Sequence, residues 1–259
     1  PLINIERPRS GMARPEAAPG KPDINLASSA EFARAFLSHL RVPVDYVDWH
    51  FYAANGWNGD YPYLGTDDEW RHYYTWGTKF RECYEAVVGL LEESCQQRPL
   101  PRLVVGEWSG DWTGDIFRDH PRSYRGSMMR TMASAVYMAD ILLFLMDRSG
   151  PDGHVAAACW HNFANGAQEM FSIQATEEYA RVLGAGRTWK GAITDEGYGV
   201  RMPLYWVFSL LSRTCGDDLL ETRLEAPDNR IKAPSPGLYT DPEYAFDRVT
   251  CCATRRGAE

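Results

Sequence analysis

The sequence has no stretch that is long and apolar enough to cross a membrane. Its most apolar run, from Met138 to Met146, contains Asp140 and falls short of the roughly 20 apolar residues that a membrane span needs. Basic side chains are also too few for a general nucleic-acid binder. There are 27 Lys and Arg against 35 Asp and Glu, a net charge of −8, whereas phosphate binding needs a positive surface. We therefore expect neither a membrane nor a nucleic acid as a partner.

The signatures of common metal and cofactor sites are missing as well. No C-x-x-C pair, H-E-x-x-H motif or G-x-G-x-x-G turn occurs, although these motifs mark many zinc and dinucleotide sites. The segment GEWSG at 106–110 differs from the G-x-S-x-G turn of serine hydrolases. We therefore expect no metal and no cofactor. The six cysteines are expected to be buried free thiols, which favours a reducing compartment.

What the sequence does contain is enough apolar material for a large core, since 44% of its 259 residues are hydrophobic. Helix-like and strand-like runs alternate along it. The pattern predicts helices at 27–40, 67–95, 127–146 and 202–212. It predicts strands at 2–5, 42–52, 103–105, 155–163, 219–224 and 246–253. Up to about residue 212 this alternation indicates parallel βαβ units.

The loops of these expected units differ in length on the two sides of the sheet. Long polar loops, such as 55–65 and 109–125, follow strands, whereas the loops after helices are short. This asymmetry is typical of a (β/α)8 barrel, whose chemistry lies at the carboxyl ends of the strands. A doubly wound sheet would give a similar alternation. Such a sheet is expected to have a glycine-rich turn after its first strand, and this sequence has none.

Three of the expected strands end with an aromatic side chain beside a polar or ionisable one. The three ends are Trp49-His50-Phe51-Tyr52, Gly106-Glu107-Trp108 and Trp160-His161-Asn162. Taken singly, such residues are usually structural. At the ends of successive barrel strands they would converge on one mouth. There the carboxylate of Glu107 could serve as a nucleophile, a base or a metal ligand.

The aromatic content is high, with 9 Trp, 14 Tyr and 10 Phe. Flat aromatic side chains suit the faces of sugar rings and line many small-ligand clefts. We expect Trp57, Trp108 and Trp160, which lie in loops or at strand ends, to line such a cleft. Trp76 and Trp206 occur at helical spacing and are expected in the core.

Three segments of the sequence resemble the C-terminal half of a clan A retaining glycoside hydrolase. They are VDYVDWHFY at 44–52, LVVGEWSGDW at 103–112, and the passage from Pro203 to Pro227. The similarity is greatest to the α-L-arabinofuranosidases of glycoside hydrolase family 51 and next to the β-xylosidases of family 39. It extends roughly over residues 27–255. It implies a partial (β/α)8 barrel at 1–215, from about strand five to strand eight, and the beginning of a C-terminal β-sandwich at 216–259.

The resemblance also implies roles for the strand-end residues. Glu107, in a Glu-Trp pair, matches the nucleophile at the end of the seventh strand. His50 and Tyr52 match a His-x-Tyr pattern at the end of the sixth. The residues implied to bind substrate are His50, Tyr52, Trp108, Trp160 and Asn162. No Asn-Glu dipeptide occurs, so the acid/base that this pair supplies on the fourth strand is expected outside this chain.

Together these expectations describe a glycosidase fragment, inactive alone, that belongs to an enzyme hydrolysing α-L-arabinofuranoside-like bonds with retention. Its partner is a carbohydrate substrate, and association of the full-length protein into a homo-oligomer stays open. Two alternatives also stay open: a non-catalytic carbohydrate-binding protein on a TIM-barrel scaffold, and an α/β protein of different chemistry. The upstream coding sequence separates the first from the enzyme, because a strand ending in Asn-Glu would indicate the enzyme.

Overall fold

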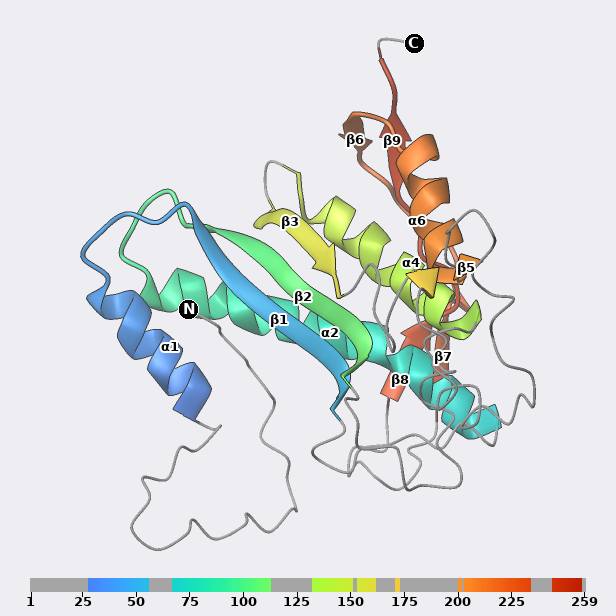
Figure 1. Cartoon of the computed structure of the whole chain (residues 1–259), viewed down its shortest axis with the longest axis horizontal. Helices are drawn as coiled ribbons and strands as arrows, with labels where there is room; N and C mark the ends of the chain where they lie inside the picture. Colours follow the sequence, from blue (N-terminus) through green and yellow to red (C-terminus); the bar gives the residue numbers. More distant parts are fainter. Residues whose placement is uncertain are drawn as a thin grey trace, which may run out of the picture.

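The described part of the chain is a mixed α/β protein with a parallel sheet and four helices (Figure 1). A computed structural model describes residues 28–55, 67–112, 132–150, 153–161, 171–172, 200–201, 203–233 and 244–257. The strand expected at 2–5, Trp57 and Asn162 lie outside these ranges. Within them, every helix is too short or too polar to span a membrane.

Three parallel strands make up the sheet, in the order β1-β2-β3. They are β1 (Tyr46–Asn55), β2 (Arg102–Trp112) and β3 (Val155–Trp160). In the chain, helix α2 (Asp67–Ser94) lies between β1 and β2, and α4 (Met132–Asp147) lies between β2 and β3. Consecutive strands are therefore neighbours, as in parallel βαβ units. This order is compatible with the expected (β/α)8 barrel, and the three described strands include no reversal of order such as a doubly wound sheet has at its switch point.

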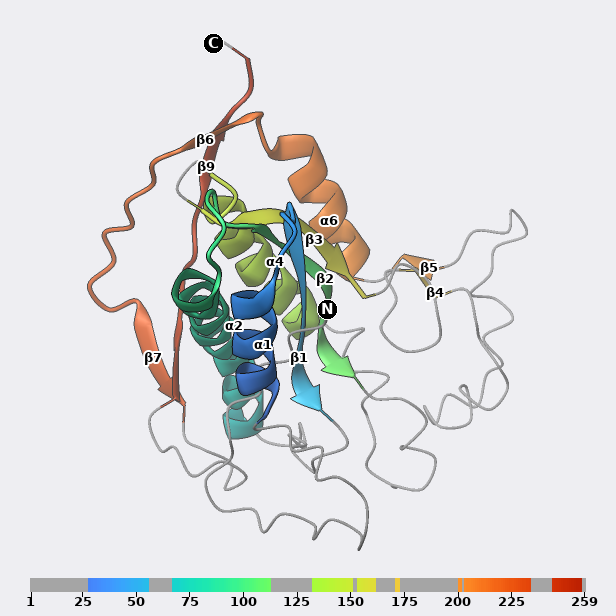
Figure 2. The same ribbon diagram turned by 90° about the vertical axis from the view of Figure 1, so that its left-hand side faces the viewer.

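The helices follow the same order as the strands. Helix α1 (Ser28–His39) packs against α2, α2 against α4, and α4 against α6 (Pro203–Thr214). Figure 2 shows α1, α2 and α4 together on one side of the strands. We call this side of the sheet the helix face and the opposite side the inner face.

Aromatic side chains form the centre of the core between the sheet and the helices. The ring centroid of Phe80 on α2 lies 5.2 Å from that of Trp49 and 5.0 Å from that of Phe51, both on β1. It also lies 6.1 Å from that of Trp108 on β2. Tilted and edge-on ring pairs at such distances stabilise beyond the area that they bury. Helix α2 is thereby fixed to both strands.

Helical spacing predicts that two tryptophans are buried in the core, and the structure confirms this for one of them. Trp76 of α2 is fully buried, which confirms the prediction. The prediction for Trp206 is wrong, because its side chain is 52% exposed while Leu204 is the residue that α6 buries. The ring of Trp206 lies instead against Tyr205, with 5.2 Å between centroids, and 5.5 Å from the guanidinium carbon of Arg201.

Several strand limits differ from those that the sequence predicts. β2 continues to Trp112, well beyond the expected 103–105, because β1 pairs with it along its whole length. β3 ends at Trp160 rather than at residue 163. The sequence also does not predict two short strands that pair antiparallel, since a strand of two residues has no periodicity to detect. They are β4 (Phe171–Ser172) and β5 (Val200–Arg201).

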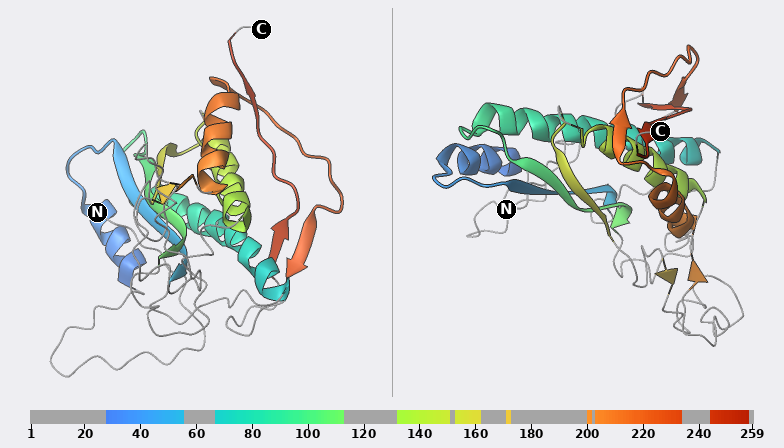
Figure 3. Two further views of the ribbon diagram at one scale, coloured as in Figure 1. Left: turned by 45° about the vertical axis from the view of Figure 1, so that its right-hand side comes forward. Right: turned by 90° about the horizontal axis from the view of Figure 1, so that it is seen from above.

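The C-terminal segment forms a two-stranded antiparallel ribbon, which the left panel of Figure 3 shows beside the helices. In it β6 pairs with β9 and β7 with β8. Between these ladders the side chain of Asn229 bonds the backbone N–H and C=O of Val249 at 2.8 and 2.9 Å, which interrupts the strand expected at 246–253. The expected β-sandwich stays a prediction. The strands are β6 (Asp218–Leu220), β7 (Arg230–Ala233), β8 (Tyr244–Asp247) and β9 (Ala253–Arg255).

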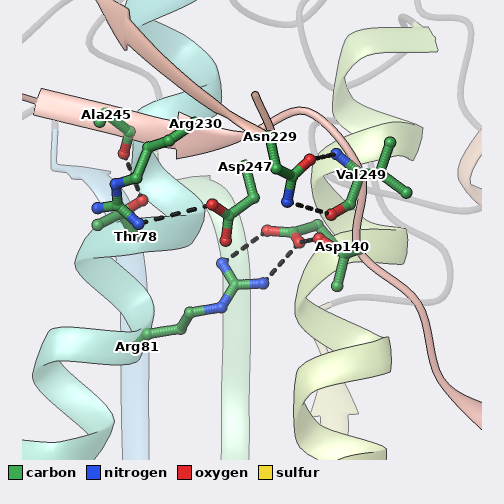
Figure 4. Close-up of polar contacts among 9 residues, drawn as sticks. Thr78, Arg81, Asp140, Asn229, Arg230, Ala245, Asp247 and Val249 are labelled. Atoms are coloured by element: carbon green, nitrogen blue, oxygen red, sulfur yellow. Dashed lines mark hydrogen bonds and ion pairs between the residues drawn. The ribbon is translucent and has the colours of Figure 1, made fainter. Parts of the chain in front are cut away.

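A carboxylate on α4 joins this ribbon to the helices (Figure 4). Arg81 of α2 donates from Nη1 and Nη2 to the two oxygens of Asp140 at 2.8 and 2.6 Å. Thr250 of the ribbon donates its hydroxyl to the same carboxylate. A Cβ at Gly77 would lie 2.3 Å from Asp140 Oδ2, so glycine leaves the space that the carboxylate fills. Asp140 therefore contacts α2 and the ribbon at once.

Two further contacts hold the ribbon on α2. The hydroxyl of Thr78 donates to the carbonyl oxygen of Ala245 at 2.6 Å. The ring of Tyr74 lies 5.5 Å from that of Phe246, and burial raises the pKa of Tyr74 above its ordinary value. The ribbon is thus packed on the outer side of the helices by polar and aromatic contacts together.

All six cysteines are free thiols, but they differ in burial. Cys95 is buried, whereas Cys159 and Cys251 are exposed, so the expectation of buried thiols is wrong for these two. Burial, and next the nearby carboxylate of Asp147, raise the pKa of the Cys252 thiol. A thiol of raised pKa is less ionised at neutral pH and therefore less nucleophilic.

We expect Asp140→Ala to lower the free energy of unfolding by about 3 kcal/mol, because it leaves the largely buried Arg81 guanidinium without its ion pair. The control is Asp218→Ala, which removes an exposed pair with Arg255 and should cost less than about 1 kcal/mol. Urea denaturation of both variants measures the difference. Equal losses would show that the Arg81–Asp140 pair contributes no more to stability than an exposed pair.

Candidate active site

A single extra residue in β2 sets the orientation of the candidate site. Trp49 of β1 pairs with Val105, but the next residue, His50, pairs with Glu107, so Gly106 is bulged out of the register. The pairing of β2 with β3 shifts in the same region. Because side chains alternate between the two faces of a sheet, one extra residue reverses the face of every residue after it.

Burial shows which face each side chain takes. Before the bulge, Val105 is fully buried on the helix face. After the bulge, Trp108 is fully buried against Phe80 of α2, so it also points to the helix face, although plain alternation from Val105 would place it on the inner face. Glu107 consequently lies on the inner face beside His50. Without the bulge, the carboxylate of Glu107 would point into the aromatic core.

On the inner face, His50 lies between two carboxylates. Its Nε2 is 3.0 Å from Asp48 Oδ2, and its Nδ1 is 3.4 Å from Glu107 Oε2. The imidazole is 20% exposed and the side chain of Glu107 is 39% exposed. Ionisable side chains from two adjacent strands therefore form one row of contacts, Asp48–His50–Glu107, and Glu107 at its end remains accessible to a ligand.

The absence of a side chain at Gly106 makes room for this row. A Cβ there would lie 2.1 Å from Asp48 Oδ1, closer than non-bonded atoms can approach. Glycine in a strand commonly marks a bulge or such a close approach. The sequence-based candidates did not include Asp48. The signal that could have found it is its spacing of two from His50, which puts both side chains on one face of a strand.

Trp108 and Trp160 lie on the opposite side of the sheet from Glu107. Their ring centroids are 4.7 Å apart in an edge-to-face arrangement, and their side chains are 0% and 8% exposed. Both belong to the core under the helices. This placement corrects the expectation that they line a cleft with Glu107, and the physical reason for Trp108 is the bulge just before it.

The remaining sequence candidates are Tyr52 and Asn162. The backbone of Tyr52 belongs to β1, where its register partner is Ser109 of β2. Asn162 lies outside the described residues. Its neighbour His161 donates its backbone N–H to the carbonyl oxygen of Trp108 at 3.0 Å, so the chain is still bonded to β2 at this point.

The arrangement offers a partly exposed carboxylate with an imidazole placed against it. Such a carboxylate can serve as a nucleophile, or as a base toward a group within hydrogen-bonding reach. Within the described ranges, no group of three or more His, Cys, Asp or Glu side chains is arranged to hold a metal ion.

Comparison with known proteins finds a distant structural relative. No family model matches the chain, and no curated protein matches its sequence. The structure is similar to that of an α-L-arabinofuranosidase from Thermotoga maritima in complex with arabinose, with a TM-score of 0.51 and 17% sequence identity. The match covers 78% of this chain and 33% of that one, so the chain spans about a third of that enzyme.

A likeness at this sequence identity concerns the fold. It shows that the chain has a fold similar to part of that enzyme. The resemblances to the α-L-arabinofuranosidases of family 51 and to the β-xylosidases of family 39 stay predictions.

We expect Gly106→Ala to displace the Asp48 carboxylate, whose side chain is 42% exposed and can move, and to lower the free energy of unfolding by about 1 kcal/mol, the low end of the cost of forcing extra volume into a site. Gly89→Ala is the matched control, because a Cβ at this position of α2 meets nothing within 4 Å and should raise stability by up to about 1 kcal/mol. Thermal unfolding of both variants provides the measurement. A Gly106→Ala variant as stable as the control would contradict the close approach.

Proposed function

We propose that this chain is the C-terminal part of the (β/α)8 barrel of a retaining glycoside hydrolase, with Glu107 as its nucleophile. The observation that carries the proposal is the position of Glu107, which the bulge turns to the inner face within 3.4 Å of His50 Nδ1. The order of the strands, the matching order of the helices and the fold likeness to an arabinofuranosidase support it.

In this proposal β1, β2 and β3 are the sixth, seventh and eighth strands of the barrel. The inner face of the sheet then lines the barrel interior, and Glu107 belongs to the seventh strand, where the family that the sequence resembles has its nucleophile. Retaining hydrolysis requires a second carboxylic acid about 5 Å from the first. Because the chain has no Asn-Glu dipeptide, we assign this acid to a strand outside the chain.

The reaction follows from these two groups. An oxygen of Glu107 forms a bond to the anomeric carbon while the glycosidic C–O bond breaks, and the second acid gives its proton to the departing oxygen. The second group, now a carboxylate, takes a proton from a water molecule while the water oxygen bonds to the anomeric carbon and the bond from that carbon to Glu107 breaks. This second displacement restores the starting configuration at the anomeric carbon and regenerates both groups. No cofactor takes part in these steps.

His50 orients the nucleophile in this scheme. Its ring contacts Oε2 of Glu107. Holding a reacting atom in one orientation lowers the entropy cost of the transition state. Tyr52 and Asn162 are proposed to contact the sugar, and the substrate is proposed to be an α-L-arabinofuranoside-like carbohydrate.

We expect Glu107→Gln in the full-length protein to lower kcat on an aryl α-L-arabinofuranoside by roughly a thousandfold or more, since it removes the covalent step. Glu92→Gln changes an exposed carboxylate on α2 and should leave kcat unchanged. Azide should restore turnover to Glu107→Ala and give a glycosyl azide of inverted configuration.

Two outcomes would count against the nucleophile. Near-normal turnover by Glu107→Gln would remove Glu107 from the reaction. Binding of arabinofuranosides without turnover by the unmodified full-length protein would favour the alternative function, a non-catalytic carbohydrate-binding protein.

We further expect residues 1–259 expressed alone to show no turnover, because they supply one of the two required carboxyl groups. The measurement is an assay of this chain beside the full-length protein on aryl arabinofuranosides and xylosides. Turnover by the chain within tenfold of the full-length protein would mean that the acid/base lies within it, and Glu6 would be the first residue to substitute.

A further inference from the structure

Asp48 is an ionisable side chain at the candidate site that the proposed reaction leaves without a role. It lies on β1 two residues before His50, and its Oδ2 is 3.0 Å from the Nε2 of that ring. Its other oxygen, Oδ1, is buried and has no hydrogen-bond partner among the described residues. Native structures contain few buried carboxylate oxygens of this kind, and each calls for an explanation.

The donor and acceptor roles in this contact follow from the groups involved. An ionised carboxylate can only accept, so Nε2 of His50 carries the hydrogen and donates it to Asp48. That bond fixes the plane of the imidazole and leaves Nδ1 as the edge facing Glu107 Oε2 at 3.4 Å. Because the carboxylate of Glu107 also only accepts, Nδ1 can bond to it only by carrying a hydrogen as well; the form of the ring that links the two carboxylates is therefore the imidazolium, which donates to both.

The backbone is shaped to receive the Asp48 carboxylate. At Gly106, the bulged residue of β2, the absence of a side chain leaves room for the carboxylate, since a Cβ there would lie 2.1 Å from Asp48 Oδ1. The residue that turns Glu107 to the inner face is therefore also the one that makes room for Asp48. Both ends of the row Asp48–His50–Glu107 depend on the same position.

The geometry also excludes Asp48 as the second catalytic acid. The two carboxyl groups of a retaining glycosidase flank the bond that is cleaved, with space for a substrate between them. Here the imidazole of His50 fills the space between Asp48 and Glu107, since each of its ring nitrogens contacts one of them. Asp48 can reach the nucleophile only through this ring.

We propose that Asp48 is a positioning residue that holds the imidazole of His50 so that its Nδ1 fixes the carboxylate of Glu107. The proposal rests on the function proposed above and adds to it the residue that orients the histidine.

The first test is spectroscopic and needs no activity. In the full-length protein labelled with ¹⁵N-histidine, we expect His50, assigned with a His50→Gln variant, to show a slowly exchanging Nε2–H proton. Asp48→Ala should lose this signal, and Asp48→Asn, whose amide oxygen can still accept, should retain it. Asp45→Asn removes an exposed carboxylate from the same segment and should change nothing. A His50 signal unchanged in Asp48→Ala would overturn the proposal.

The second test is kinetic and asks whether Asp48 acts through His50. We expect Asp48→Ala to lower kcat about tenfold with KM changed less than twofold, and Asp48→Asn to recover most of the loss. In a His50→Ala background, Asp48→Ala should have no further effect, because the residue through which it acts is gone. An equal loss in both backgrounds would overturn the proposal.

The two tests separate this proposal from the proposed function. If Glu107→Gln retains full turnover, the assignment of Glu107 fails, and the orientation of the ring is still decided by the Nε2–H signal. If Glu107→Gln abolishes turnover while Asp48→Ala leaves both kcat and the histidine signal unchanged, the function stands and the role of Asp48 is overturned.

Discussion

The extra residue at Gly106 is the constraint on which the rest of the site depends. A β-strand sends successive side chains to opposite faces, so an uninterrupted β2 would bury Glu107 against Phe80 and leave Trp108 on the inner face. The bulge exchanges them. An ionised carboxylate is thereby kept out of an apolar core, where it would be very unfavourable, and a large aromatic ring is buried instead.

The same exchange ties the candidate site to the core beneath it. Trp108 packs its ring between those of Phe80 and Trp160, and burying one such side chain stabilises by about 1.5–3 kcal/mol. Glu107 is the residue directly before this buried ring. The backbone position of Glu107 is therefore fixed by the packing of a neighbour that lies on the other face of the sheet, and such rigid support is what a preorganised site requires.

Much of the architecture could be predicted from the sequence, because long helices and apolar strands leave periodic patterns. The four helices and the order of the parallel units follow from such patterns. The pairing of His50 with Glu107 could be anticipated from their places at the ends of successive strands. Trp108 and Asp48 could not be placed, since a bulge reverses the face to which the following side chains point and leaves no sign of this in the amino-acid composition. Trp206 and the ribbon could not be placed either, because they depend on which helix surfaces find a neighbour, and that is a property of the assembled fold.

The contact of Asp140 with Thr250 has a consequence for how the chain is made. The two residues are 110 positions apart in sequence, and Thr78 is 167 positions from Ala245, to which it donates. At a synthesis rate of roughly 5–20 residues per second, Thr250 is added roughly 5–20 s after Asp140. The ribbon can therefore pack on the outer side of the helices only after the segment that follows α6 has been synthesised. Its contacts with α2 and α4 form later than those that join each helix to its neighbouring strands in the chain.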